Sequence, residues 1–322
     1  MTVSIIIAVK TWQKNLEECV VKCGQLDFKD YEIIILPDES FVLPFVMVNV
    51  KIIPTGNTNP AKKRDIGLKH AKGEILAFLD DDAYPAKDWL KNAVLDFSDP
   101  NVAAVGGPAV TPDSDSYPKK ASGLVYSSLA VSGKYVYRYI PVKKKFFVDD
   151  YPSCNFLVRK EIMEELGGFD TDFWPGEDTK LCLDITQRLG KKILYDPGAL
   201  VYHHRRPLFT AHLHQILSYA THRGYFVKRY PGNSLRLAYF IPSLFVVFLI
   251  FGSAVSLFSH QFLFIYLIPV LVYLHIVAVF SILASRRLNL ILMVFLGIIS
   301  THICYGIYFI KGLFSSSLRE AK

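Results

Sequence analysis

The stretch GEILAFLDDD, residues 73–82, decides the fold of the N-terminal part of the chain. Its apolar run, residues 75–79, is followed at once by three consecutive aspartates. Apolar residues on both faces are typical of a strand that is buried inside a parallel sheet. Asp80, Asp81 and Asp82 therefore lie at the carboxyl end of a buried strand, which is the edge where open α/β sheets bind ligands.

The segments before this stretch alternate between strand and helix patterns. Such alternation predicts an α/β domain with a Rossmann-like, mostly parallel sheet. Asp38 follows one of these strands and is expected at the same sheet edge as Asp80. The predicted strands are residues 3–9, 31–36, 50–53 and 75–79, and the predicted helices are residues 15–25 and 60–71.

The end of the chain has a different composition. Three apolar stretches, Leu237–Phe258, Phe262–Ala284 and Leu288–Ile310, carry no Asp, Glu, Lys or Arg in their centres. Each exceeds the ~20 residues that a helix needs to cross a bilayer. We therefore expect an all-α membrane domain with about three transmembrane helices over residues 237–322, preceded by an amphipathic interfacial segment over residues 206–236.

Basic residues suggest the orientation of these stretches. The basic segment before Leu237 and the pair Arg286-Arg287 both favour the cytosolic side. Three full crossings would place Lys311 on the opposite side, against the same rule, and a re-entrant third segment would remove this conflict.

Charge and cysteine content limit the possible partners and compartment. The net charge of +7 comes partly from the basic residues just before the first apolar stretch, which suits anionic lipid headgroups, so we expect no nucleic-acid partner. The five cysteines are an odd number without zinc-type pairing, which predicts reduced thiols in a cytosolic domain. We expect no secretory signal, because Met1 leads directly into a strand pattern.

The aspartate triplet carries the first chemical signal. At ~4 Å and an effective dielectric constant of ~20, each pair of carboxylates repels by ~4 kcal/mol, so a cation and a diphosphate would offset the cluster. The alternative is a solvated acidic turn or an N-cap for a helix that starts near Pro85. The triplet alone favours neither.

A second acidic cluster is Trp174-Pro175-Gly176-Glu177-Asp178. A helix pattern that ends near Gly190 follows it, so Asp178 lies in the first helical turn. Considered alone, this cluster is better explained by the ordinary favourable pairing of Glu177 and Asp178 with the helix dipole.

Taken together and in this order, the motifs resemble those of the family 2 glycosyltransferases, which share the nucleotide-sugar-binding GT-A fold. The resemblance covers roughly residues 3–205, and we expect the catalytic domain to span residues 1–205. The motifs that carry it are VSIIIAV (3–9), EIIILPD (32–38), KRD (63–65), GEILAFLDDD (73–82), GGFD (167–170), GED (176–178) and VYHH (201–204).

The resemblance implies a role for each matching position. Asp178 would act as general base, and Asp80 and Asp82 would hold Mg²⁺ or Mn²⁺, with His203 as a third ligand or a buried structural histidine. The donor would contact Asp38, Arg64, Asp65, Asp80 and Asp81. Apart from the resemblance, we expect acceptor contacts from Trp174 and Glu177 in the second acidic cluster. Gln215 and Arg223 recur at helical spacing in the interfacial segment and are also expected near the acceptor, although a plain membrane-surface helix explains them at least as well.

The resemblance also implies a reaction. We expect inverting, metal-dependent transfer of a sugar from a nucleotide-diphosphate sugar to a lipid-linked acceptor, either a polyprenyl phosphate or diphosphate or a glycolipid, at the cytosolic face of the cell membrane. Pro37 and Asp65 depart from the usual motifs and leave the nucleotide open. The alternatives are a membrane nucleotide-sugar hydrolase or nucleotidyltransferase, and a non-catalytic nucleotide-sugar-binding subunit.

Overall fold

The computed structural model describes residues 1–171, 173–258 and 260–318. The chain divides into two compact units. Residues 1–112 and 137–204 form the first unit, and residues 113–136 and 205–318 form the second. The segment 113–136 therefore leaves the first unit in the middle of its sequence.

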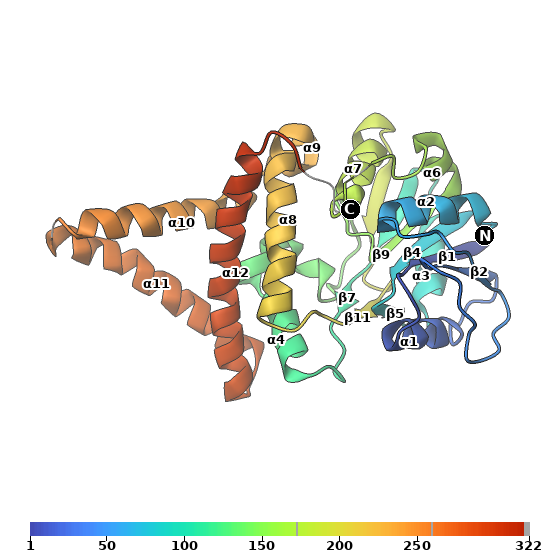
Figure 1. Cartoon of the computed structure of the whole chain (residues 1–322), viewed down its shortest axis with the longest axis horizontal. Helices are drawn as coiled ribbons and strands as arrows, with labels where there is room; N and C mark the ends of the chain where they lie inside the picture. Colours follow the sequence, from blue (N-terminus) through green and yellow to red (C-terminus); the bar gives the residue numbers. More distant parts are fainter. Residues whose placement is uncertain (172, 259, 319–322) are drawn as a thin grey trace. The chain divides into compact units, whose positions relative to one another are not determined.

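The first unit is built on an eight-stranded sheet with the order β3-β2-β1-β4-β9-β6-β10-β8 (Figure 1). The four strands β3, β2, β1 and β4 are parallel to one another, whereas β9 runs antiparallel between β4 and β6. The predicted mostly parallel α/β sheet is confirmed. The strands are β1 (Val3–Ala8), β2 (Tyr31–Leu36), β3 (Val50–Ile52), β4 (Ile75–Asp80), β6 (Val102–Gly106), β8 (Phe146–Val148), β9 (Asn155–Arg159) and β10 (Lys192–Tyr195).

Helices cover both faces of this sheet because alternate strand residues point to opposite sides. Ile5 and Ile7 of β1 pack in one core with α1 (Lys14–Cys23) and α3 (Trp89–Asp96). On the other side, Gly67 of α2 (Pro60–His70) lies directly against Ile6. The helices α6 (Lys160–Leu166) and α7 (Glu177–Leu183) follow later in the chain, and a π-helical turn, η2 (Asp184–Arg188), continues α7.

A small second sheet lies beside the end of β4. It has the order β5-β11-β7, with β5 (Ala83–Pro85), β7 (Ala109–Val110) and β11 (Val201–His203). In the antiparallel pairing of β11 with β5, His203 is the partner of Ala83. This pairing brings His203 next to the aspartate triplet, although more than a hundred residues separate them in the sequence.

The second unit is entirely helical. It contains α4 (Tyr117–Tyr126), α5 (Leu129–Ser132), α8 (Thr210–Arg229), α9 (Pro231–Ser234), α10 (Leu237–Ser256), α11 (His260–Ala284) and α12 (Leu288–Phe314), and a 3₁₀ turn, η1 (Gly133–Arg138), joins it to the first unit. Three described helices, α10, α11 and α12, are long and apolar enough to cross a membrane. Their positions match the three apolar stretches in the sequence.

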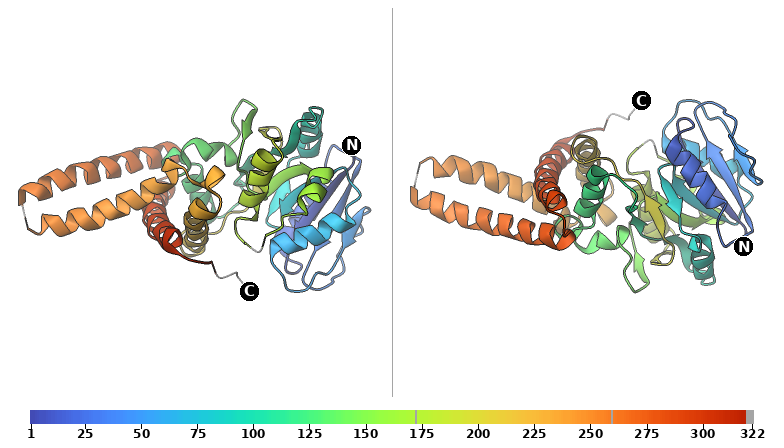
Figure 2. Two further views of the ribbon diagram at one scale, coloured as in Figure 1. Left: turned by 90° about the horizontal axis from the view of Figure 1, so that it is seen from above. Right: turned by 90° about the horizontal axis from the view of Figure 1, so that it is seen from below.

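These three helices are not arranged as a simple bundle. α10 and α11 form a hairpin that extends away from the rest of the unit. α12 lies alongside α8 and crosses the base of this hairpin, in the views of both Figure 1 and Figure 2. The contact between α8 and α12 extends from Leu208, beside Gly297, to Lys228, whose ammonium donates a hydrogen bond of 2.7 Å to the carbonyl oxygen of Ser315. α12 is therefore in contact with α8 along the full length of α8.

Candidate active site

The carboxyl ends of β2, β1 and β4 lie side by side in the first unit, as the sequence predicts. Asp38 follows β2, and Asp80 is the last residue of β4. The buried side chain of Lys63, from α2, reaches this edge and donates hydrogen bonds to the carbonyl oxygens of Val9 at 2.6 Å and Leu36 at 3.3 Å. The Lys63 ammonium also pairs with the Asp38 carboxylate, which fixes that side chain at the sheet edge.

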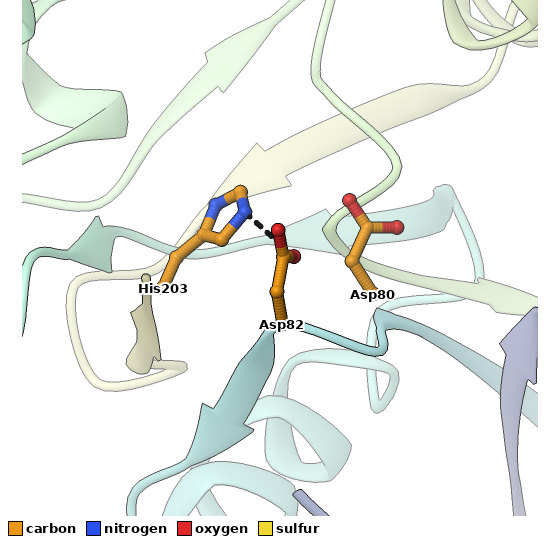
Figure 3. Close-up of side chains that lie close together, drawn as sticks. All are labelled: Asp80, Asp82 and His203. Carbon is orange, nitrogen blue, oxygen red and sulfur yellow. Dashed lines mark ion pairs between the residues drawn. The ribbon is translucent and has the colours of Figure 1, made fainter. Parts of the chain in front are cut away.

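Asp80, Asp82 and His203 converge at this edge (Figure 3). One potential ligand atom from each lies within 4.8 Å of the others, and Nε2 of His203 is 3.0 Å from Oδ1 of Asp82. Two carboxylates and an imidazole are a suitable donor set for a divalent cation. The structure thus brings together the three residues that the resemblance assigns to the metal.

The alternative that the triplet caps a helix near Pro85 is wrong. After Asp80 the chain turns directly into β5, and the next helix, α3, begins only at Trp89. The backbone of Asp82 instead pairs with the residue that follows β11, because the N–H of His204 donates to the carbonyl oxygen of Asp82 at 2.9 Å.

Burial raises the pKa values of Asp80 and Asp81. The pKa of Asp81 rises to about 7, through burial first and then through the charges of Asp82 and Asp80, while a hydrogen bond from Gln13 opposes the rise. Burial also raises the pKa of Asp80, whereas the Arg64 guanidinium opposes this effect. The cluster therefore favours the uptake of positive charge, whether a proton or a metal ion.

Arg64 connects this edge to the second acidic cluster. Its Nη2 donates to Oδ1 of Asp80 at 2.7 Å, and its Nη1 donates to Oε1 of Glu177 at 2.7 Å. Burial alone would lower the pKa of Arg64, but the carboxylates of Asp80 and Glu177 outweigh it, with a further contribution from Asp178, so the pKa is raised. The two acidic clusters therefore meet around one buried guanidinium.

Asp178 lies at the start of α7. Its Oδ2 accepts a hydrogen bond from the N–H of Ser153 at 3.3 Å, and its Oδ1 accepts one from the N–H of Thr179 at 2.7 Å. Gly176 precedes the helix with a φ of 112°, which is a conformation that favours glycine. The GED motif thus combines a glycine turn with two adjacent carboxylates that both accept hydrogen bonds from Ser153.

The remaining predicted residues fall in two groups. In the first unit, Asp65 accepts the N–H of Phe169 at 2.8 Å, and Trp174 is 38% exposed. In the second unit, Gln215 donates to the hydroxyl of Tyr219 at 2.8 Å, and the guanidinium of Arg223 lies 5.0 Å from the ring centroid of Tyr239. The roles of these residues in donor or acceptor binding stay predictions.

Sequence reasoning assigned no role to three residues at the site. Lys63 holds Asp38, Gln13 contacts Asp81, and Ser153 contacts both Asp178 and Glu177. The sequence did indicate Lys63, because a lysine beside Arg64, in a helix that covers the sheet edge, is a candidate partner for the carboxylates at that edge. It did not indicate Ser153 or Gln13, because no local pattern marks them.

Comparisons with known proteins agree with the geometry. The model of glycosyl transferase family 2 matches residues 4–167. The pre-mycofactocin glycosyltransferase of Mycobacterium tuberculosis is 33% identical over 147 residues, which are 46% of this chain and 30% of that protein. The chain thus spans less than a third of the length of this relative.

A second relative matches over more of its length. It is the dolichyl N-acetyl-alpha-D-glucosaminyl phosphate 3-beta-D-2,3-diacetamido-2,3-dideoxy-beta-D-glucuronosyltransferase of Methanococcus voltae, 24% identical over 252 residues, with 73% of this chain and 77% of that protein covered. Among solved structures, the mannosyltransferase PcManGT from Pyrobaculum calidifontis, in complex with GDP-Man and Mn²⁺, superimposes with a TM-score of 0.50 at 20% identity and covers 70% of this chain and 63% of that one. This likeness supports the GT-A fold. The family model covers half of the sequence, so the chain belongs to glycosyl transferase family 2.

Proposed function

We propose that this chain is a glycosyltransferase that transfers a sugar from a nucleotide-diphosphate sugar to a lipid-linked acceptor. The observation that carries the proposal is the meeting of the two acidic clusters around Arg64, with Asp80, Asp82 and His203 on one side and Glu177-Asp178 on the other. A cation-binding edge beside a separate carboxylate is the arrangement that metal-dependent sugar transfer requires.

The donor side of the site is assigned to the sheet edge. Asp80, Asp82 and His203 would hold Mg²⁺ or Mn²⁺, since their ligand atoms lie within 4.8 Å of one another. Such an ion supplies positive charge to the departing diphosphate. Asp38, held by Lys63, is assigned to the nucleotide base.

The acceptor side is assigned to Asp178. Its carboxylate accepts the proton of the acceptor hydroxyl while the oxygen of that hydroxyl attacks the anomeric carbon. The bond from the anomeric carbon to the diphosphate breaks as the new bond forms. One displacement from the opposite face inverts the configuration at that carbon.

The lipid-linked acceptor and the membrane location rest on two observations. Three described helices are long and apolar enough to cross a bilayer. The relative from Methanococcus voltae is named for a dolichyl phosphate-linked substrate. We therefore propose a multi-pass protein of the cell membrane that works on a polyprenyl-linked sugar or glycolipid, with its catalytic domain on the cytosolic side.

The test is to incubate purified protein with a panel of nucleotide sugars, Mn²⁺ or Mg²⁺ and membrane lipid extract, and to identify the product by mass. We expect a glycosylated lipid. In Asp178→Asn, transfer should fall about 100-fold or more while donor binding persists, because a general base contributes about that much. Asp82→Ala should instead lose metal-dependent donor binding.

Other outcomes would contradict the proposal in different ways. Donor consumption without any sugar acceptor would indicate a hydrolase or nucleotidyltransferase. Full function of Asp178→Asn would indicate a non-catalytic nucleotide-sugar-binding subunit. Equal transfer to a soluble acceptor would overturn the lipid assignment alone.

A further inference from the structure

Two neighbouring residues of α2, Arg64 and Asp65, hold the two ends of the segment that leads to Asp178. This segment, residues 167–178, is called the base segment here, and residue 172 is outside its described part. At its start, Oδ1 of Asp65 accepts the N–H of Phe169 at 2.8 Å. Gly168 has a φ of 90°, and a Cβ at this position would lie 2.4 Å from Oδ1 of Asp65. Glycine is therefore what lets the carboxylate of Asp65 approach so closely.

The end of the base segment is held by Glu177. Oε1 of Glu177 accepts hydrogen bonds from Nη1 of Arg64 at 2.7 Å and from the hydroxyl of Ser153 at 3.2 Å. Oε2 accepts the N–H of Gly176 at 3.0 Å. The side chains of Arg64 and Glu177 are each only 4% exposed, so Glu177 faces the protein interior rather than an incoming acceptor.

Arg64 is positioned by carboxylates on two different segments. Its two terminal nitrogens go to Asp80 and to Glu177, and its Nε is buried without a hydrogen-bond partner in the described part of the chain. A buried donor without an acceptor is unfavourable, so the orientation of the guanidinium follows from the two carboxylates rather than from full satisfaction of its donors. A lysine has no such planar fork and cannot make both contacts with the same geometry.

The ring of Phe169 adds a second contact to the same guanidinium. It lies 5.8 Å from the Arg64 guanidinium carbon and packs against Phe78 of β4 at a centroid distance of 5.1 Å. Arg64 thus touches the start of the base segment as well as its end. The base segment is fixed to β4, the strand that carries the aspartate triplet, at both ends.

We propose that Arg64 and Glu177 are positioning residues, and that the Asp80–Arg64–Glu177 bridge sets the place of Asp178 relative to the metal-binding edge. This proposal rests on the proposed function for the role of Asp178. It gives Arg64 and Glu177 a task inside the protein, whereas the sequence suggested that Arg64 contacts the donor and Glu177 the acceptor. Asp178 is the next residue after Glu177, so any movement of Glu177 moves the base.

The experiment compares Arg64→Lys and Glu177→Gln with the full-length protein in detergent or nanodiscs. Both variants weaken the bridge while keeping a similar side-chain size. Hydrogen–deuterium exchange of peptides from the base segment is measured without substrate, and kcat and KM are measured with the nucleotide sugar that the panel identifies. We expect faster exchange in the base segment and a kcat lower by roughly 10- to 100-fold, because a misplacement of about 1 Å can cost about that much. KM for the donor should change less than kcat.

Arg159→Lys is the matched control. Arg159 is half-buried, donates to the carbonyl oxygens of Val102 at 2.9 Å and Phe97 at 2.6 Å, and lies over the Phe97 ring, but these contacts are with neither acidic cluster. Its replacement should alter exchange around β6 and α3 and leave exchange in the base segment unchanged. Both changes break the same bridge. The fold-loss of kcat in the double variant Arg64→Lys/Glu177→Gln should therefore be smaller than the product of the fold-losses in the two single variants.

Two results would overturn the proposal. Unchanged exchange of the base segment in Arg64→Lys would show that the bridge does not hold it. A higher donor KM with an unchanged kcat would show that Arg64 binds the donor. If the wild-type protein transfers no sugar, the proposed function fails, whereas the exchange measurement still reports on the bridge.

Discussion

His203 and His204 are adjacent in the sequence, yet their side chains have different neighbours. Nε2 of His203 lies 3.0 Å from Asp82, whereas Nε2 of His204 lies 2.9 Å from Glu18. We expect His203→Ala to weaken Mn²⁺ binding about 10-fold or more, since one ligand of the set is lost. Mn²⁺ titration followed by electron paramagnetic resonance measures the affinity. His204→Ala is the control and should bind Mn²⁺ as the wild type does; equal loss in both variants would contradict a specific role for His203.

Asp65 predicts a pH dependence of stability. Burial raises its pKa to about 6, against the effect of the hydrogen bond from Phe169. Because the folded-state pKa lies above the ordinary value, the stabilising contribution of Asp65 is complete below about pH 4 and is lost as the pH rises through about 6. Asp65→Asn does not titrate and can still accept the N–H of Phe169.

The unfolding temperature of Asp65→Asn should therefore rise relative to that of the wild type as the pH rises. We define the difference as the free energy of unfolding of the variant minus that of the wild type. This difference should be about 1–2 kcal/mol more favourable to the variant at pH 7.5 than at pH 5, after allowance for partial solvent exposure. Thermal unfolding of the detergent-solubilised protein at both pH values measures this. A constant difference between the two pH values would show that Asp65 does not titrate in this range.

At the scale of elements, the contact between α8 and α12 depends on glycine. A Cβ on Gly312 would lie 2.0 Å from the carbonyl oxygen of Thr221, and one on Gly224 would lie 2.1 Å from that of Phe309. Both clashes are with backbone, which cannot rotate away as a side chain can. Small residues allow helices to approach this closely.

We therefore expect Gly312→Ala to destabilise the protein by about 1–3 kcal/mol through overpacking, although alanine favours helices over glycine by about 1 kcal/mol. Thermal unfolding measures the effect. Leu296→Ala, on the exposed face of the same helix, is the control and should change stability by less than about 0.5 kcal/mol. Equal or greater stability of Gly312→Ala would mean that the two helices are not in such close contact.

The elements differ in how far the sequence predicts them. The strands β1, β2 and β4 are local runs of β-branched and apolar residues, so their positions and the acidic residues at their ends could be predicted. The antiparallel insertion of β9 between β4 and β6 could not, because strand pairing depends on contacts between distant segments.

The site shows the same division. The family motifs place Asp80, Asp82, His203 and Asp178 in one reaction, and the structure brings the first three together. The pair Arg64–Glu177 joins residues 113 positions apart, and no periodic pattern indicates it. Likewise, nothing local in residues 113–136 indicates that they pack with α12 rather than with the sheet.

At the scale of the whole molecule, the packing of α12 bears on membrane topology. α12 contacts α8 along the full length of α8, and α8 carries exposed polar groups such as His214, Lys228 and Arg229. A helix bound to such a partner is not surrounded by hydrocarbon. We therefore expect α10 and α11 to cross the bilayer as a hairpin and α12 to lie at the same membrane face as α8, which also satisfies the positive-inside rule for Lys311.

Single cysteines introduced at Leu257, Ser285 and Ser316 into a chain without its native cysteines test this topology. In intact cells, a membrane-impermeant thiol reagent should label position 257 but neither 285 nor 316. Labelling of both 257 and 316 would instead support three full crossings. Inverted membrane vesicles provide the control, since the labelled and protected positions should exchange.

The discontinuous second unit has a consequence for the order in which the chain is synthesised. α4 leaves the ribosome well before α12, whose residues Val294 and Ile298 pack in one core with Ala121 and Val125. Until α12 has emerged, this apolar face lacks its final neighbours, while the strands on both sides of α4 can already pair. We expect nascent chains that end before residue 288 to bind chaperones through residues 117–126, and site-specific crosslinking of stalled chains of increasing length would reveal when that binding ends.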